Sequence, residues 1–217
     1  MKKWMLLGVL TMFATLLIGA DKIFEINEKG EIFLPKSLMY SFQNIGFECR
    51  GGYVCRGTSG IRLEAAQPFS SMTVAVTAGI KELPKKDAVL FLRPGFHNTL
   101  VITPQGKVAA SFWVETAKGK YENVKLFTRR TVRPGSGSYF RAALSVTQNN
   151  SGSVVRLYLD GALEAEKTFS APLFDYKRMF HVGGAPTIPG ICGFNGVLRS
   201  FQLFNGALSD DEIASLR

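Results

Sequence analysis

Short segments of this chain alternate between apolar and polar residues with a period of two. In residues 71–80, Met72, Val74 and Val76 fall on one face of such a segment, and residues 139–147 alternate in the same way. This pattern is typical of antiparallel strands that bury one face. Turn-forming residues separate many such segments. We therefore predict an all-β fold in which two antiparallel sheets pack as a sandwich.

The clearest predicted hairpin joins residues 154–159 to residues 162–166 through Asp160 and Gly161. An Asp-Gly pair favours a type I′ turn, because both central residues of that turn need positive φ angles. The turn explains Asp160 without a role as a metal ligand.

One short helix is predicted at the C-terminus. Ser209 and Glu212 have the spacing of a capping box, in which each side chain bonds the other residue's backbone N–H. Asp210 and Asp211 complement the positive N-terminal end of such a helix. We interpret this group of acids as helix capping and not as a catalytic cluster.

The first twenty residues have the pattern of a signal peptide. Lys2 and Lys3 precede an apolar run over residues 4–18, and Gly19-Ala20 follows. The run is shorter than the roughly 20 apolar residues of a membrane-spanning helix. We therefore expect cleavage after Ala20, no stable membrane span, and a periplasmic, cell-surface or extracellular location in a bacterial host. The remaining residues 21–217 are of a length typical of one domain.

Two stretches carry a resemblance to a known family. The first is the strand at residues 139–147 with the hairpin at 155–161, and the second is the stretch Asn205-Gly206-Ala207-Leu208-Ser209 before the last helix. They resemble laminin G-like jelly-roll domains of the concanavalin A-like lectin and glucanase superfamily, over residues 47–217. The resemblance implies a jelly-roll sandwich. It leaves activity open, because this fold carries sugar binders, adhesion modules and some enzymes.

The chain also departs from that family. Members often carry an acidic pair after the Phe-x-Gly turn, whereas residues 197–200 here read Val-Leu-Arg-Ser. Calcium is common among the relatives that the resemblance points to, but no ligand set can be matched to it in this sequence. Calcium therefore stays unassigned.

The chain has three cysteines, Cys49, Cys55 and Cys192. In an oxidising compartment Cys49 and Cys55 can close a small loop that contains two glycines. We favour that disulfide, and a pairing of Cys192 with either of the other two stays open.

The sequence offers little for catalysis. Glucanases of the superfamily carry alternating carboxylates of the type Glu-x-Asp-x-x-Glu, and no such run is present. Glu164 and Glu166 share a strand face but lack a third acid. A polysaccharide lyase needs a Tyr or His near a basic residue to abstract a proton next to a uronate carboxylate, and His97 and His181 stand outside any such motif. We expect no enzyme activity; a polysaccharide hydrolase or lyase and a structural envelope protein are the alternatives.

The best candidates for ligand binding are basic. The chain carries 26 Lys and Arg against 17 Asp and Glu, a net charge of +9, which favours anionic partners. A basic stretch follows Trp113, whose ring could stack on a sugar, and Arg binds carboxylate or sulfate in a bidentate manner. The predicted ligand is a glycan, with an anionic one favoured by the arginines, or an extracellular protein; nucleic acid is not expected for an exported chain. The predicted binding residues are Trp113, Arg129, Arg130 and Arg133.

Overall fold

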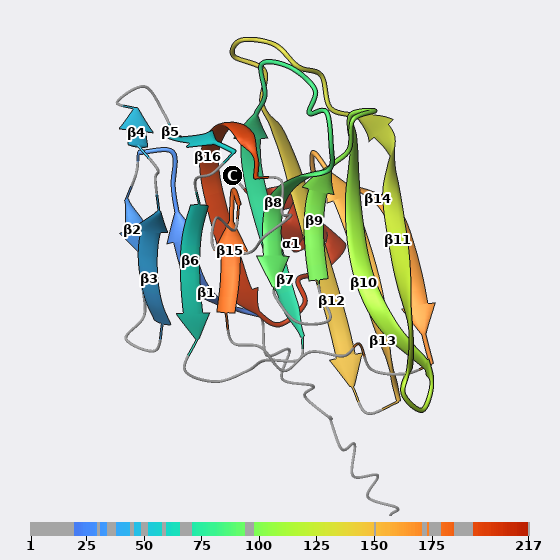
Figure 1. Cartoon of the computed structure of the whole chain (residues 1–217). Coiled ribbons are helices and arrows are strands. Elements are labelled where there is room, and N and C mark those ends of the chain that lie inside the picture. The colour runs from blue at the N-terminus through green and yellow to red at the C-terminus, as the bar shows by residue number, and fades with distance from the viewer. Residues whose placement is uncertain are drawn as a thin grey trace, which may run out of the picture.

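The structure is a computed structural model of the whole chain (Figure 1). It describes residues 20–29, 31–33, 38–43, 46–48, 52–57, 60–65, 71–93, 98–149, 151–170, 173, 179–184 and 193–216. The predicted signal peptide lies almost wholly outside these residues and stays a prediction. No helix in the described part of the chain is long and apolar enough to cross a membrane.

One sheet, here called sheet A, contains the C-terminal strands and the first strand of the chain. Its order is β14 (Ala162–Phe169), β13 (Gly152–Leu159), β12 (Phe140–Asn149), β7 (Met72–Gly79), β16 (Asn195–Asn205), β1 (Asp21–Ile26) and β2 (Ile32–Phe33), and β5 (Gly52–Arg56) joins β16 to β4 (Gly46–Glu48). All its pairings are antiparallel.

The facing sheet B is built from the middle of the chain. Its order is β11 (Lys120–Thr131), β10 (Lys107–Ala117), β9 (Asn98–Ile102), β8 (Ala88–Arg93), β15 (Met179–Val182), β6 (Gly60–Ala65) and β3 (Leu38–Gln43). With the short helix α1 (Asp210–Ser215), the two sheets confirm the predicted antiparallel sandwich with a C-terminal helix.

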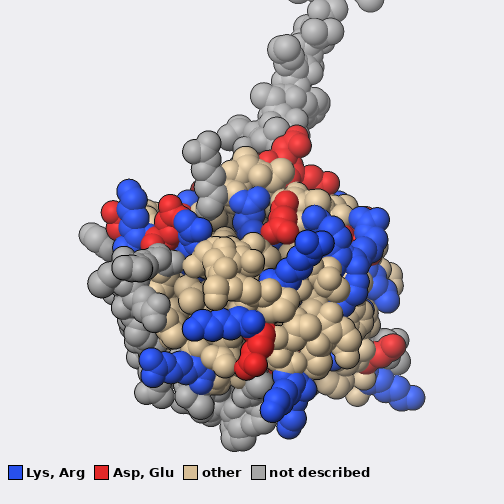
Figure 2. All heavy atoms as spheres, turned by 90° about the horizontal axis from the view of Figure 1, so that it is seen from above, with Lys and Arg blue, Asp and Glu red and all other residues tan. Residues whose placement is uncertain are grey.

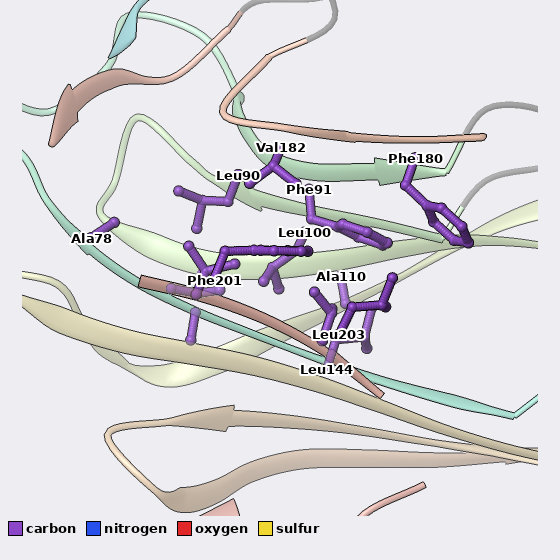
Figure 3. Packing of buried hydrophobic residues seen from close by; sticks show 14 of the residues in the cluster. Ala78, Leu90, Phe91, Leu100, Ala110, Leu144, Phe180, Val182, Phe201 and Leu203 are labelled. Atoms are coloured by element: carbon purple, nitrogen blue, oxygen red, sulfur yellow. The ribbon is translucent and has the colours of Figure 1, made fainter. Parts of the chain in front are cut away.

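Aromatic rings hold the two sheets together (Figure 3). Phe91 of sheet B lies 6.1 Å from Phe201 of sheet A and 5.9 Å from Phe180, between ring centroids, and none of the three is exposed to solvent. Burial of each such side chain contributes about 1.5–3 kcal/mol. The alternation seen in the sequence therefore supplies one apolar face from each sheet to a shared core.

The two local predictions with a specific mechanism are confirmed. Asp160 and Gly161 have φ angles of 52° and 79°, as the predicted hairpin turn requires. At α1, Ser209 Oγ accepts from the backbone N–H of Glu212, and Glu212 Oε2 accepts from the backbone N–H of Ser209 at 2.7 Å. The helix packs on the outer face of sheet A, where Ile213 is fully buried.

Several connections gather at one end of the sandwich, which is the upper end in Figure 1. The backbone N–H of Gly135 donates to the carbonyl of Ile80 at 2.9 Å, and that of Val132 donates to Gly106 at 2.8 Å. These bonds tie together residues 80–87, 103–106 and 132–139, and with the turn at 160–161 these segments are called the loop end below. Figure 2 looks onto it and shows more basic than acidic side chains.

Candidate functional site

Three neighbouring hollows open at the loop end, and Tyr139 lines all of them. The arginine hollow, of about 580 Å³, is lined by Arg129, Arg130, Arg133, Tyr139, Leu159 and Asp160 among others. The mixed-charge hollow, of about 510 Å³, lies over the outer face of sheet A and includes Thr77, Arg141, Arg199 and Ser200. The third, of about 480 Å³, is bordered by Gly79 and residues 135–139. Tyr139 is 39% exposed, so it is accessible to a ligand.

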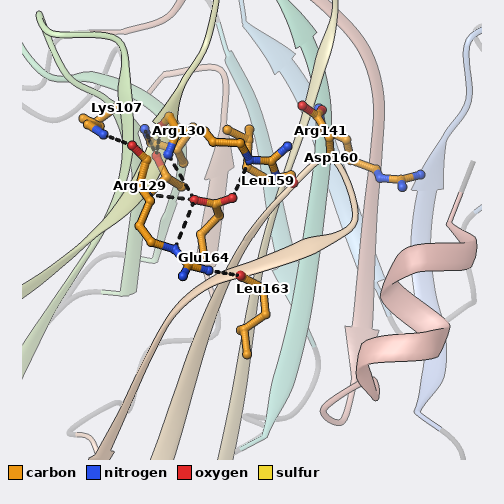
Figure 4. A network of polar contacts seen from close by, with 10 residues as sticks. Lys107, Arg129, Arg130, Arg141, Leu159, Asp160, Leu163 and Glu164 are labelled. Atoms are coloured by element: carbon orange, nitrogen blue, oxygen red, sulfur yellow. Dashed lines mark hydrogen bonds and ion pairs between the residues drawn. The ribbon is translucent and has the colours of Figure 1, made fainter.

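Glu164 is the centre of a polar network beside the arginine hollow (Figure 4). Its side chain is only 4% exposed, and Oε2 accepts from the backbone N–H groups of Arg129 at 2.8 Å and Arg130 at 3.1 Å. Oε1 lies 2.5 Å from Nε of Arg130. Burial alone would raise the pKa of this carboxyl, but the hydrogen bonds from Arg130 and Arg129 outweigh it and lower the pKa. Glu164 thus joins β14 of sheet A to β11 of sheet B.

The three arginines predicted to bind a ligand differ in how much of their hydrogen-bonding capacity is already used within the protein. The guanidinium of Arg130 bonds both Glu164 and the carbonyl oxygen of Leu159. Arg129 donates to the carbonyl of Leu163 at 2.9 Å, although its side chain is 77% exposed. Arg133 is exposed and has no hydrogen bond or ion pair with the residues that the structure describes, which among the three leaves it the most available to a ligand.

Trp113 does not lie with these arginines. It is on β10 opposite Asn123 of β11, six residues before Arg129 along that strand. At a rise of about 3.3 Å per residue, the two positions are roughly 20 Å apart. Phe112 and Val114 on either side are buried in the core, so Trp113 is on the outer face of sheet B.

Tyr139 is the aromatic residue that the structure places beside the arginines, and it was not among the binding residues predicted from the sequence. The guanidinium carbon of Arg199 lies 4.9 Å from the centroid of its ring, and Arg199 also pairs with Glu28 at 2.5 Å. The available signal was the alternation of residues 139–147, which places Tyr139 on the same face as Arg141 and Thr147.

The other residues considered for chemistry have structural surroundings. Glu166 bonds Arg156 at 2.5 Å, so the two alternating glutamates have separate partners. His181 is 1% exposed and neither ring nitrogen has a partner; burial, together with the nearby charge of Arg62, lowers its pKa and favours the neutral ring. His97 lies outside the described residues.

Cys55 is a free, buried thiol in the structure, and burial raises its pKa to about 12. Cys49 and Cys192 lie outside the described residues, so the predicted Cys49–Cys55 disulfide is not shown and stays a prediction. No group of three His, Cys, Asp or Glu side chains that could hold a metal occurs among the residues that the structure describes. Calcium stays unassigned.

Comparison with known proteins gives a family and a set of similar folds. A laminin G family model, described as Concanavalin A-like lectin/glucanases superfamily, matches residues 56–214. No curated protein matches the chain. Domain 4 of AbnA, an extracellular arabinanase from Geobacillus stearothermophilus solved with arabinotriose, has a TM-score of 0.62 at 15% identity, with 90% of this chain and 98% of that chain covered.

Two further solved structures have similar folds. The CBM40 of a Ruminococcus gnavus IT-sialidase, bound to α2,3-sialyllactose, has a TM-score of 0.53 at 21% identity, with 68% of this chain and 82% of that chain covered. A Trypanosoma rangeli sialidase in complex with sialic acid has a TM-score of 0.62 at 14% identity over 90% of this chain and 32% of that chain. At these identities the likeness concerns the fold.

Proposed function

The chain belongs to the concanavalin A-like lectin/glucanase superfamily, and from this premise we propose that it is an exported, non-catalytic module that binds an acidic carbohydrate at the loop end. The observation that carries the proposal is the exposed, unpaired Arg133 in a hollow that also contains the accessible ring of Tyr139. Sugar sites in proteins commonly combine an aromatic surface with a few fixed polar groups, and this hollow has both.

The charge of the arginine hollow favours an anionic sugar. Three arginines line it, and Asp160 is the acidic residue among its lining. Asp160 already accepts from the backbone N–H of Arg141 at 2.8 Å, and Glu164 is enclosed behind Arg130. A guanidinium binds a carboxylate or sulfate through two parallel hydrogen bonds, which Arg133 is free to form. Arg129 can add charge from its exposed side chain.

Binding without catalysis is supported by the state of the carboxylates. A glycosidase needs one carboxyl group as acid and a second as base or nucleophile, both facing the sugar. Glu164 is held by two backbone N–H groups and Arg130, and a carboxylate held in this way is a poor proton donor. Asp160 is committed to the hairpin turn and to β12.

The solved structures with similar folds offer chemical probes. Two of them contain arabinotriose and sialyllactose, a neutral and an acidic oligosaccharide. The site described here favours the acidic one, because its free group is a cation.

A glycan array tests the proposal. It is probed with protein expressed from the full sequence, once in the presence of calcium and once in the presence of a chelator. We expect acidic glycans to bind in both conditions and Arg133→Ala to reduce that binding strongly. Lys118→Ala is the matched control, because it removes one exposed charge from the turn at the opposite end of β10 and β11. A blank array, or equal binding by Arg133→Ala, contradicts the proposed site.

A further inference from the structure

We infer that the mixed-charge hollow is a second subsite that binds a neutral sugar joined to the acidic one, so that the ligand is an oligosaccharide with an acidic residue next to an uncharged residue. This inference rests on the proposed function of the loop end. It names the class of ligand from residues that the arginine hollow does not contain.

The floor of the mixed-charge hollow is a row of polar side chains in register across three central strands of sheet A. Ser200 of β16 is paired with Thr77 of β7, and Thr77 is paired with Arg141 of β12. Directly opposite residues of antiparallel strands share one face, with Cβ atoms about 4.5–5.5 Å apart. All three line the hollow.

Several hydrogen-bonding groups of this row are free, although Nη2 of Arg141 donates to the carbonyl of Ala214 at 3.4 Å. Within the described part of the chain, Nε of Arg141 is buried and has no partner, and the hydroxyl groups of Thr77 and Ser200 have none either. A buried donor without an acceptor is uncommon in proteins and is relieved when a ligand oxygen binds to it. A donor beside two hydroxyl groups, which can donate or accept, suits the hydroxyl groups of a sugar.

Several of the charged residues around the row already have polar partners. Arg199 pairs with Glu28 at 2.5 Å, and Glu25 accepts from Gln202 at 2.7 Å. The lining holds Lys29, Arg141 and Arg199 against Glu25, Glu28 and Asp160, which balances three positive against three negative charges. Unlike the arginine hollow, this hollow has no excess charge to attract a second anion. An uncharged, hydroxyl-rich ligand fits it better.

The two hollows are contiguous, because Tyr139 and Asp160 line both. An oligosaccharide with its acidic sugar at Arg133 can extend past Tyr139 to the row of Ser200, Thr77 and Arg141. A single oligosaccharide that spans both hollows accounts for the positive charge of the arginine hollow and for the free hydroxyl groups of the mixed-charge hollow.

Isothermal titration calorimetry with two matched pairs of probes tests the inference. The pairs are N-acetylneuraminic acid with sialyllactose, and glucuronic acid with a glucuronic acid–xylose disaccharide. We expect the neutral extension to increase affinity about tenfold in at least one pair, as two net hydrogen bonds would do. Thr77→Val and Ser200→Ala should remove most of this gain and leave binding of the acidic monosaccharide unchanged.

The control is Thr147→Val, which removes an exposed hydroxyl from the same face of β12 at the opposite end of the strand. Equal affinity for both members of each pair would overturn the second subsite even if Arg133→Ala abolishes all binding. Loss of monosaccharide and oligosaccharide binding together in Thr77→Val would overturn it as well. Acidic probes that do not bind at all, or that bind Arg133→Ala normally, would reject the proposed function itself.

Discussion

Nε of Arg130 lies 2.5 Å from a carboxylate oxygen of Glu164 across the edge where the two sheets meet. From the sequence, the first residue was a candidate for ligand binding and the second was one of the few candidates for catalysis. The structure makes them partners of each other. Glu164 also binds the backbone N–H groups of β11, so this pair closes an edge of the sandwich. Arg130 of the pair lines the proposed site.

Removal of the Glu164 carboxylate should destabilise the fold. We expect Glu164→Ala to lower the free energy of unfolding by about 2–4 kcal/mol, which is below the full value for breaking a buried pair because Arg130 is half exposed. Urea denaturation at pH 7 measures the change. Glu166→Ala is the control, since its pair with Arg156 is more exposed and should contribute less than about 1 kcal/mol. Equal effects of the two substitutions would show that Glu164 has no special role.

His181 should make stability depend on pH. Burial lowers its pKa below the ordinary value of 6.5, so the unfolded chain binds this proton more readily than the folded protein. The free energy of unfolding is therefore highest above pH 6.5. It declines as the pH falls from 6.5 to the pKa of His181 in the folded protein, by at most about 1.4 kcal/mol per pH unit. His181→Leu should remove this decline without loss of stability at pH 8, because neither ring nitrogen has a partner. A decline of the same size in the variant would assign it to other groups.

The thiol of Cys55 should be unreactive in the folded protein. Its pKa of about 12 leaves almost no thiolate at pH 8, and the thiolate is the form that reacts with iodoacetamide. Mass spectrometry of labelled peptides should therefore find Cys55 unmodified until the protein is denatured. If the predicted Cys49–Cys55 disulfide forms on export, labelling also requires a reductant. Labelling in denaturant alone would contradict the disulfide, and labelling of the folded protein would contradict the burial.

Substitution of Gly161 by alanine should destabilise the protein more than the same substitution at Gly119, which lies in a comparable turn. A Cβ at Gly161 would lie 3.1 Å from Nη2 of Arg141 and 3.2 Å from Cα of Ala214 in α1, and the φ angle is +79°. Gly119 has a similar φ of +73° but open space around it. We expect Gly119→Ala to cost about 1 kcal/mol from the backbone conformation and Gly161→Ala about 1 kcal/mol more from contact. Thermal unfolding followed by circular dichroism separates them; identical losses would mean that α1 moves freely away.

The sequence predicted features that depend on a few adjacent residues. The positive φ angles of Asp160 and Gly161 and the capping box of Ser209 and Glu212 follow from local chemistry, and both are present. Strand alternation predicted the two apolar faces and hence the sandwich.

The site could be predicted only in part, because it depends on where distant segments meet. The position of Trp113 relative to Arg129 depends on the length and register of β10 and β11, which alternation does not determine. The pairing of Arg130 with Glu164 joins residues 34 apart in the sequence. Tyr139 became a site residue because the turn around Glu28, strand β16 and the loop before β12 converge on it.

The most direct test of the proposed site is the affinity of the wild-type protein and of Arg133→Ala for one acidic glycan, at low and high salt. If Arg133 binds the acidic group, the variant should lose about 1.5–3 kcal/mol of binding free energy, roughly tenfold to a hundredfold in affinity. The wild-type affinity should also fall as salt screens the charges at the loop end, and the variant should depend less on salt. Affinities of the two proteins that agree at every salt concentration would contradict the account.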